Sequence, residues 1–315
     1  MRAIAYRKHG QIEELQEVDI PEPKTGRNRV LVAVHSIGLN PLDYRLRRGE
    51  MGKLTAFSKP KLIGSDFSGH VLEVGSHVAD LSKGDRVYGM VFQPLTGTSA
   101  DRISVKRQNL SQSPFNVDDT TAATIPLAAL TAYQSLHNLA HLQADQRVLL
   151  NGASGGVGTY GLQLAKIAGA HVTAVTSHRN ADWVQELGAD KVIDYTQHDF
   201  TLMDATYDVI FDAYGNRSFP EARACLTEKG VYISTIPSVK NFGQSMCNML
   251  RGPQNKIIMV KSVAADLDNI RALVESGKLK PIVDSQFERD QIHAAYAKLE
   301  TKRARGKIGV RMKVP

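Results

Sequence analysis

The chain has 315 residues, 42% of them hydrophobic and 23% charged, with two cysteines and a formal net charge of +7. This length favours two domains, each large enough for its own core, and this composition excludes disordered and fibrous proteins. Two late cysteines, Cys225 and Cys247, argue against a disulfide framework or a Cys-based zinc site, and the lack of an apolar run of ~20 residues indicates a cytosolic protein without a membrane span.

Short β-like segments follow one another from Met1 to about Thr120. They are rich in β-branched and apolar residues, and Gly, Pro, Asn and Asp separate them. The clearest are Arg29–Val34, Ser68–Val74, Arg86–Val91 and Ile103–Val105. We therefore expect a compact, partly barrel-like β domain over residues 1–120.

Strands and helices alternate over residues 121–265. The predicted strands are Arg147–Asn151, His171–Thr176, Val192–Tyr195, Tyr207–Asp212 and Val231–Ser234. Helices follow the first two, the second of them with Asn180 as its N-cap, and Ser218 opens a helix before the last strand. Such alternation is typical of a Rossmann-type α/β domain with a doubly wound parallel sheet.

The tail after Asp266 has a different pattern. It contains two predicted helices and ends in a single strand, Lys307–Met312, which is too isolated to extend the parallel sheet. We therefore expect residues 266–315 to return to the first domain and complete it.

A Gly-rich turn, Ala153-Ser154-Gly155-Gly156-Val157-Gly158, lies between an apolar strand and a helix. In that context Gly155 lets the backbone approach a pyrophosphate, Gly158 lets helix and strand pack closely, and the helix N-terminus offers N–H groups. Ala153 stands where the first glycine of the motif is usual. The alternative is a tight turn with no ligand, but the context favours a nicotinamide dinucleotide.

The end of the second strand indicates which dinucleotide is bound. An NAD site places an acid there for the ribose hydroxyl, whereas Thr176–Asn180 contains none. Ser177 can donate to a 2′-phosphate and Arg179 can pair with it, and Tyr195 is placed to join them. The alternatives are that Arg179 is a plain surface residue and that Tyr195 only packs. We predict NADPH as the cofactor.

Several short motifs together resemble the medium-chain dehydrogenase/reductase superfamily, and within it the zinc-independent quinone oxidoreductase (zeta-crystallin-like) branch. Besides the Gly-rich turn, they are Asn40-Pro41-Leu42-Asp43, Gly64-Ser65-Asp66-Phe67-Ser68-Gly69, Gly84-Asp85-Arg86-Val87, Thr131-Ala132-Tyr133, Leu187-Gly188-Ala189-Asp190 and Phe211-Asp212. The resemblance covers essentially the whole chain. It implies a GroES-like, β-rich catalytic domain and an active site in the cleft against the nucleotide-binding domain.

Zinc ligands are missing at the positions where the resemblance would place them. The zinc-dependent alcohol dehydrogenases of the superfamily carry a catalytic Cys in place of Asn40 and a His-Glu pair in place of Ser65-Asp66. The sequence has no cysteine before Cys225, and its nearby candidates do not recreate the N/S ligand set that zinc prefers. Those candidates are His35, His70, His77 and Asp66, and we interpret the histidines as core or surface residues. We expect no metal.

The resemblance also assigns individual residues. It places Asn40 and Thr131 near the nicotinamide, has Asp43 brace a loop, and makes Tyr44 a substrate-facing or proton-donating group, with packing as the alternative. The cofactor residues that it implies are Ser154, Gly155, Gly156 and Val157 at the phosphates, Ala213, Tyr214 and Gly215 at the nicotinamide ribose, and Lys307 before the last strand. The segments Leu46–Lys59 and Lys240–Asn255 are expected to rim the substrate pocket, Gly243, Gln244, Ser245, Met246 and Met249 giving an adaptable lining.

The predicted function is hydride transfer from NADPH to a quinone or another conjugated carbonyl acceptor without zinc. A simple ketone needs a Lewis acid, whereas a conjugated acceptor spreads the incoming charge onto an oxygen. An enoyl or 2-alkenal reductase is the nearest alternative. An NADPH-binding regulator that binds RNA or membranes through a basic surface is the alternative from another class. We expect a small-molecule substrate, a homodimer and no nucleic-acid partner.

Overall fold

The computed structural model describes residues 1–51, 59–91, 96–236 and 252–312, and the chain divides into two compact units. The first unit comprises Met1–Leu130, Lys261–Gly277 and Pro281–Pro315, and the second comprises Thr131–Val260 and Lys278–Lys280. The first unit thus includes helix α2 (Asp119–Ala123), which packs on strands of its larger sheet.

The first unit is built on two β-sheets. A seven-stranded sheet has the order β15-β16-β3-β5-β6-β8, with β7 also paired to β3, and a three-stranded sheet has the order β2-β1-β4. Its strands are β1 (Arg2–Tyr6), β2 (Gln16–Asp19), β3 (Arg29–Leu39), β4 (Lys61–Leu62), β5 (Asp66–Val74), β6 (Arg86–Met90), β7 (Arg102–Lys106), β8 (Leu110–Gln112), β15 (Val283–Glu288) and β16 (Lys307–Arg311). Its other helices are α1 (Pro41–Arg47), α8 (Ala264–Glu275) and α9 (Ile292–Glu300).

Alternating apolar residues make the core of this unit. Val30, Val32 and Val34 of β3 are fully buried, and Phe67 and Val71 of β5 belong to the same apolar cluster. The β-like reading of the N-terminal part is therefore confirmed, because β-branched side chains at a period of two fill one face of a sheet.

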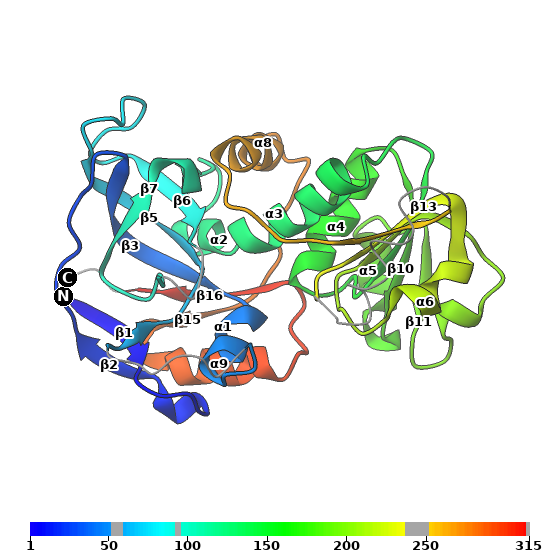
Figure 1. Ribbon diagram of the computed structural model, residues 1–315, viewed down its shortest axis with the longest axis horizontal. Helices are drawn as coiled ribbons and strands as arrows, with labels where there is room; N and C mark the ends of the chain where they lie inside the picture. The colour runs from blue at the N-terminus through cyan, green and yellow to red at the C-terminus, as the bar shows by residue number, and fades with distance from the viewer. Residues whose placement is uncertain (52–58, 92–95, 237–251, 313–315) are drawn as a thin grey trace. The chain divides into compact units, whose positions relative to one another are not determined.

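The C-terminal tail joins this sheet, as predicted. Strand β16 pairs antiparallel with β3, with Ile308 opposite Leu39 and Val310 opposite Ile37, and in Figure 1 the red strand runs beside the blue one. Strand β15, which pairs parallel with β16, was not predicted. None of its residues is fully buried, so it lacks the apolar pattern by which a strand is recognised.

The second unit is a six-stranded parallel sheet with the order β11-β10-β9-β12-β13-β14. Its strands are β9 (Arg147–Asn151), β10 (His171–Thr176), β11 (Lys191–Asp194), β12 (Tyr207–Asp212), β13 (Leu226–Ser234) and β14 (Gln254–Ile257), and its helices include α4 (Gly156–Ile167), α5 (Ala181–Glu186) and α6 (Phe219–Ala222). Helix α3 (Pro126–Tyr133) spans the boundary between the units. The order reverses between β9 and β12, where open α/β sheets bind ligands. The five predicted strands are confirmed, and β14, which is short and polar, was missed.

No helix among the described residues is long and apolar enough to cross a membrane. The predicted pocket rim lies largely outside the described residues. Residues 52–58 of the segment Leu46–Lys59 are not described, and neither are five residues of the segment Lys240–Asn255, namely Gly243, Gln244, Ser245, Met246 and Met249.

Candidate functional site

The turn between β9 and α4 has the backbone of a phosphate-binding loop. Gly152, directly after the strand, has a φ of +83°, a conformation that favours glycine. Gly155 is the N-cap of α4, and the helix begins at Gly156. The motif predicts its first glycine at the position of Ala153, but the left-handed conformation that closes the turn belongs to Gly152, one residue earlier.

Two glycines of this turn are needed for different reasons. A Cβ on Gly158 would lie 2.1 Å from the carbonyl oxygen of Gly152, so the packing of the helix against the strand requires glycine there. A Cβ on Gly155 would meet only the Gly152 oxygen, at 3.4 Å, which is ordinary contact. The chain's own packing therefore does not require glycine at 155. Glycine at this position leaves space in front of the helix N-terminus, where a pyrophosphate would come close to the backbone.

Ser154 ties the Gly-rich turn to the end of the next strand. Its Oγ accepts hydrogen bonds from Thr176 Oγ1 and from Asn180 Nδ2, each at 3.1 Å. Asn180 stands at the N-cap of α5, as predicted, but its side chain makes no capping bond to that helix. Its side chain binds Ser154, so the contacts of Ser154 fix the turn after β9 to the end of β10.

The end of β10 carries the residues predicted to select the cofactor. Ser177 follows the strand and Arg179 is exposed in a short 3₁₀ turn, His178–Asn180. Tyr195, just past β11, is 61% exposed, so its ring is not part of the core. The ends of β10 and β11 lie together because the Tyr195 amide donates to the carbonyl of Thr176, at 3.0 Å.

An acid that the sequence reading overlooked lies at the same edge. Asp194 Oδ1 accepts from the amide of His178 at 3.1 Å and from the amide and hydroxyl of Thr196 at 3.0 and 2.8 Å. The hydrogen bonds from Thr196, the largest cause, lower the pKa of Asp194. Asp194 comes from the next strand and fixes the backbone beside Arg179, which the segment Thr176–Asn180 alone does not reveal.

The turn after β12 packs against the Gly-rich turn. A Cβ on Gly152 would lie 3.0 Å from Tyr214 Cβ, and the amide of Ala213 donates to the carbonyl of Asn151 at 3.1 Å. The Tyr214 ring is 52% exposed, and Gly215 has a φ of +75°. The predicted ribose wall, residues 213–215, therefore lies directly beside the Gly-rich turn.

Buried Asp212 holds this second turn in place. Its Oδ1 accepts from the side chain of Asn151 and the amide of Gly215, both at 2.8 Å, and its Oδ2 accepts from Tyr232 Oη at 3.0 Å and the amide of Arg217 at 3.0 Å. A buried carboxylate with four partners is well satisfied, so this edge of the sheet is rigid.

A second group of predicted residues forms a buried polar network in the first unit. Lys307 Nζ donates to Leu39 O at 2.9 Å and to Asn40 Oδ1, and it lies 3.6 Å from Asp66 Oδ2. The other end of the same amide, Asn40 Nδ2, donates to Asp66 Oδ2 at 2.9 Å, and the amide of Leu127 donates to Asp66 Oδ1 at 2.9 Å. The Asn40 side chain is thus held at both ends by charged groups.

Asp43 binds the backbone of the loop before α1. Its Oδ2 accepts from the backbone amide of Asn40 at 2.8 Å and from Tyr296 Oη at 3.3 Å, while its Oδ1 is buried without a hydrogen-bond partner. Burial, aided by the charge of Asp66, raises the pKa of Asp43 to about 7. Burial likewise raises the pKa of Asp66 to about 6 and lowers that of Lys307.

Replacing Asp43 with asparagine is expected to change how stability depends on pH. The pKa of Asp43 is raised to about 7 in the folded protein, so the folded state keeps a proton that the unfolded chain releases near pH 4. Stability from this group is therefore lost as the pH rises from about 4 to about 7. Asp43→Asn should unfold at a higher temperature than wild type above pH 7, and the difference should shrink toward pH 5. A loss of stability that is the same at every pH would contradict this.

The remaining predicted catalytic residues, Tyr44 and Thr131, are both buried. The Tyr44 ring is 3% exposed and the guanidinium of Arg48 lies 5.2 Å from its centroid, so packing accounts for its position. Thr131 lies in α3 and belongs to the second unit. A proton-donating role for Tyr44 and a nicotinamide contact for Thr131 stay predictions.

The site around Asn40 does not suit a catalytic zinc. A zinc at this place would need Asn40, Ser65 and Asp66 as ligands, without any thiolate or imidazole. Moreover, the Lys307 ammonium already binds the Asn40 oxygen and lies 3.6 Å from the carboxylate of Asp66. A divalent cation would be repelled by this buried positive charge.

Comparison with known proteins extends the likeness to both units. The alcohol dehydrogenase GroES-like domain family matches residues 26–121, and the zinc-binding dehydrogenase family matches residues 187–310. A chloroplast envelope quinone oxidoreductase homolog of Arabidopsis thaliana is 31% identical over 98% of this chain and 97% of its own length. An NADPH-dependent alkenal/one oxidoreductase, chloroplastic, of the same plant is 34% identical over 98% of this chain and 79% of its own.

Solved structures share the same fold. The quinone oxidoreductase of Coxiella burnetii matches with a TM-score of 0.91 and 30% identity, covering 99% of each chain. The match therefore extends over both units of the chain.

Proposed function

The chain belongs to the medium-chain dehydrogenase/reductase superfamily of NAD(P)-dependent oxidoreductases, and on that premise we propose that it transfers a hydride from NADPH to a quinone or another conjugated carbonyl compound without zinc. The observation that carries this proposal is the buried ammonium of Lys307, which holds Asn40 and Asp66 where a zinc enzyme has its metal ligands. The relatives named quinone oxidoreductase and alkenal/one oxidoreductase support it.

The second unit supplies the groups that would hold the cofactor. Ser154, Gly155, Gly156 and Val157 would bind the pyrophosphate, Ser177, Arg179 and Tyr195 the 2′-phosphate, and Ala213, Tyr214 and Gly215 the nicotinamide ribose. When bound, NADPH supplies the hydride. The exposed rings of Tyr195 and Tyr214 give flat apolar surface at the strand ends.

The network of the first unit would act by position and charge. Asn40 is held at both ends, by Lys307 at its oxygen and by Asp66 at its nitrogen, so its side chain cannot turn without breaking a charge-assisted bond. A fixed amide beside a buried ammonium is a preorganised polar environment of low dielectric, which is suited to an oxygen that gains negative charge. We also propose that Lys307 contacts the bound cofactor.

Reversing the charge of Arg179 is expected to weaken NADPH binding roughly 10- to 100-fold, because one charged hydrogen bond to the 2′-phosphate is lost. NADH has no 2′-phosphate, so its binding should be nearly unchanged. Fluorescence titration of both cofactors with Arg179→Glu measures this. The matched control is Arg223→Glu, an exposed arginine of the same unit. An unchanged preference for NADPH would show that Arg179 does not bind the phosphate.

Steady-state rates test the function itself. We expect turnover of a simple benzoquinone or of an α,β-unsaturated ketone with NADPH, at the same rate with and without a chelator, and no turnover of a simple saturated ketone. An alkenal reductase, favoured by the alkenal/one relative, would prefer the unsaturated ketone. If NADPH binds and neither conjugated acceptor is reduced, the proposal is wrong.

The quaternary state and location are part of the same proposal. We expect a homodimer with a small-molecule substrate and a cytosolic location. Light scattering of the purified protein tests the first, and fractionation of the source cells tests the second.

A further inference from the structure

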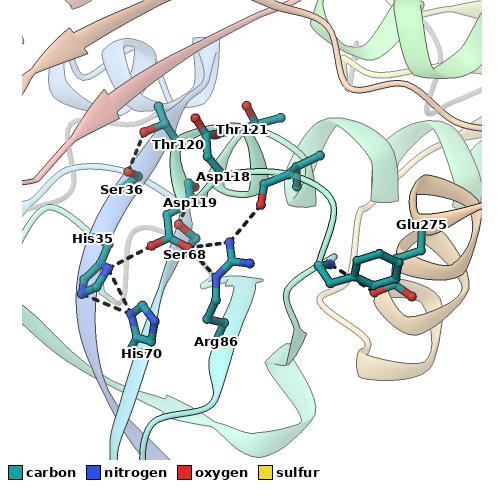
Figure 2. Close-up of polar contacts among 12 residues, drawn as sticks. His35, Ser36, Ser68, His70, Arg86, Asp118, Asp119, Thr120, Thr121 and Glu275 are labelled. Atoms are coloured by element: carbon teal, nitrogen blue, oxygen red, sulfur yellow. Dashed lines mark hydrogen bonds and ion pairs between the residues drawn. The ribbon is translucent and has the colours of Figure 1, made fainter. Parts of the chain in front are cut away.

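Two histidines and a carboxylate that the proposed function does not use meet on the first unit. His35 Nδ1 lies 2.9 Å from Asp119 Oδ2 and 3.0 Å from His70 Nδ1 (Figure 2). One ligand atom from each of the three residues lies within 4.8 Å of the others. They come from three elements, β3, β5 and α2, and all three are partly exposed.

A β-bulge puts His35 in this position. Strands β3 and β5 pair Val34 with Gly69 and then Ser36 with Ser68, so His35 is an extra residue on β3. At such a bulge, two successive side chains are turned toward the same side of the sheet. Accordingly His35 contacts Asp119 while its neighbour Ser36 contacts Thr120, both on α2.

Helix α2 is fixed to the two strands independently of the histidines. Ser36 Oγ and Thr120 Oγ1 are 3.0 Å apart, and Ser68 Oγ donates to the carbonyl of Asp119 at 2.5 Å (Figure 2). Helix α2 is therefore held against β3 and β5 by bonds that do not involve the side chains of the three ligand residues. A metal would meet a preorganised site rather than three mobile side chains.

The spacing of the ligand atoms suits a tetrahedral metal ion. With Zn–N and Zn–O distances of about 2.0–2.1 Å, neighbouring ligand atoms of a tetrahedral zinc lie about 3.3–3.4 Å apart. The separation of His35 Nδ1 from Asp119 Oδ2 is 2.9 Å and that from His70 Nδ1 is 3.0 Å, both within about half an ångström of this spacing. We propose that His35, His70 and Asp119 bind one Zn²⁺ ion, with water as the fourth ligand.

Arg86 defines which oxygen of Asp119 is available. Its Nε and Nη2 donate to Asp119 Oδ1 at 3.1 and 2.8 Å, and Nη2 also donates to Val117 O at 3.0 Å. The carboxylate would therefore bind through Oδ2 alone, with its other oxygen hydrogen-bonded, as is usual for carboxylate ligands. The positive charge of Arg86 lowers the affinity of the site for any cation. The site therefore suits Zn²⁺, which imidazole nitrogen binds well, rather than Ca²⁺ or Mg²⁺, which prefer oxygen ligands.

This site is separate from the zinc positions of the alcohol dehydrogenases. None of its ligands belongs to the network of Asn40, Asp66 and Lys307, and neither hydride transfer nor NADPH is needed for its test. Zn²⁺ bound there would link β3, β5 and α2, and it would therefore stabilise the folded chain by mass action.

The test is a Zn²⁺ titration of the purified full chain by calorimetry after treatment with a chelator, together with thermal unfolding. We expect one site per chain and an unfolding temperature that rises with Zn²⁺. His70→Phe and, separately, Asp119→Asn should weaken binding by about 100-fold or more, since even the loss of an outer partner of a ligand costs 10- to 100-fold. His77→Phe, an exposed histidine of the same unit that is outside the cluster, is the matched control and should bind as wild type does.

Co²⁺ in place of Zn²⁺ gives a second readout. Wild type and His77→Phe should show the intense visible absorption of four-coordinate Co²⁺. Asp119→Asn, which changes the size of the side chain less than His70→Phe does, should not show it. Undiminished Zn²⁺ binding by both cluster variants, with folding checked without metal, would overturn the proposal. So would the lack of any Zn²⁺ binding by wild type.

Discussion

Valine in place of Gly155 is expected to abolish NADPH binding and to leave the protein folded. The Cβ of a residue at 155 has only an ordinary contact with the chain, the Gly152 oxygen at 3.4 Å, so the fold has room for it. The side chain would instead occupy the space in front of the N-terminus of α4, and two or more charged hydrogen bonds to the pyrophosphate would be lost. NADPH affinity should fall at least about 100-fold, with the unfolding temperature within a few degrees of wild type.

Gly158→Val is the matched variant in the same turn, and it should behave in the opposite way. Its Cβ would lie 2.1 Å from the Gly152 oxygen and 2.7 Å from Ala153 Cα, both of them backbone atoms. The helix must move from the strand, which costs about 1–3 kcal/mol or more of stability. Thermal unfolding and a fluorescence titration with NADPH separate the two variants. If Gly155→Val kept wild-type affinity, the turn would not be the phosphate site.

Methionine in place of Lys307 should be the most destabilising change in the first unit. The ammonium is buried and is the cation that lies beside Asp66 and holds Asn40 Oδ1. Removing one partner of a buried ion pair leaves an uncompensated charge and costs about 3–5 kcal/mol. Chemical denaturation should show a loss of this size for Lys307→Met.

A double variant identifies the cause of that loss. Lys307→Met with Asp66→Asn removes both charges, so it should recover a large part of the lost stability. Lys278→Met, at an exposed lysine, should change the free energy of unfolding by no more than about 0.5 kcal/mol. A double variant less stable than Lys307→Met alone would mean that the charge of Asp66 is not the reason.

The sequence predicted those elements whose hydrophobic pattern is strong. The parallel strands β9, β10 and β12 begin and end where the apolar runs do, because both of their faces are buried. Strands β14 and β15 carry few buried side chains and were missed. Where burial does not impose a pattern, pairing with a neighbouring strand decides the structure, and a single sequence does not display that pairing.

The strand-turn-helix geometry of the Gly-rich turn was predictable because the signals for it are local. All of its residues lie within a single βα unit, and only the role of Gly152, with its φ of +83°, was placed one residue too late. The contacts within the other two groups could not be predicted, because they join residues that lie far apart in the sequence. Lys307 meets Asn40 across 267 positions, and His35 meets Asp119 across 84.

The fate of the transferred hydrogen tests the central claim most directly. An α,β-unsaturated ketone is reduced in ordinary water with NADPH that carries deuterium at the transferable position of the nicotinamide, and the product is analysed by NMR. We expect one deuterium on the carbon β to the carbonyl group and a proton from water on the carbon α to it, with the carbonyl intact. Deuterium on the carbonyl carbon, as in an alcohol dehydrogenase, or no product from either a quinone or the unsaturated ketone, would contradict it.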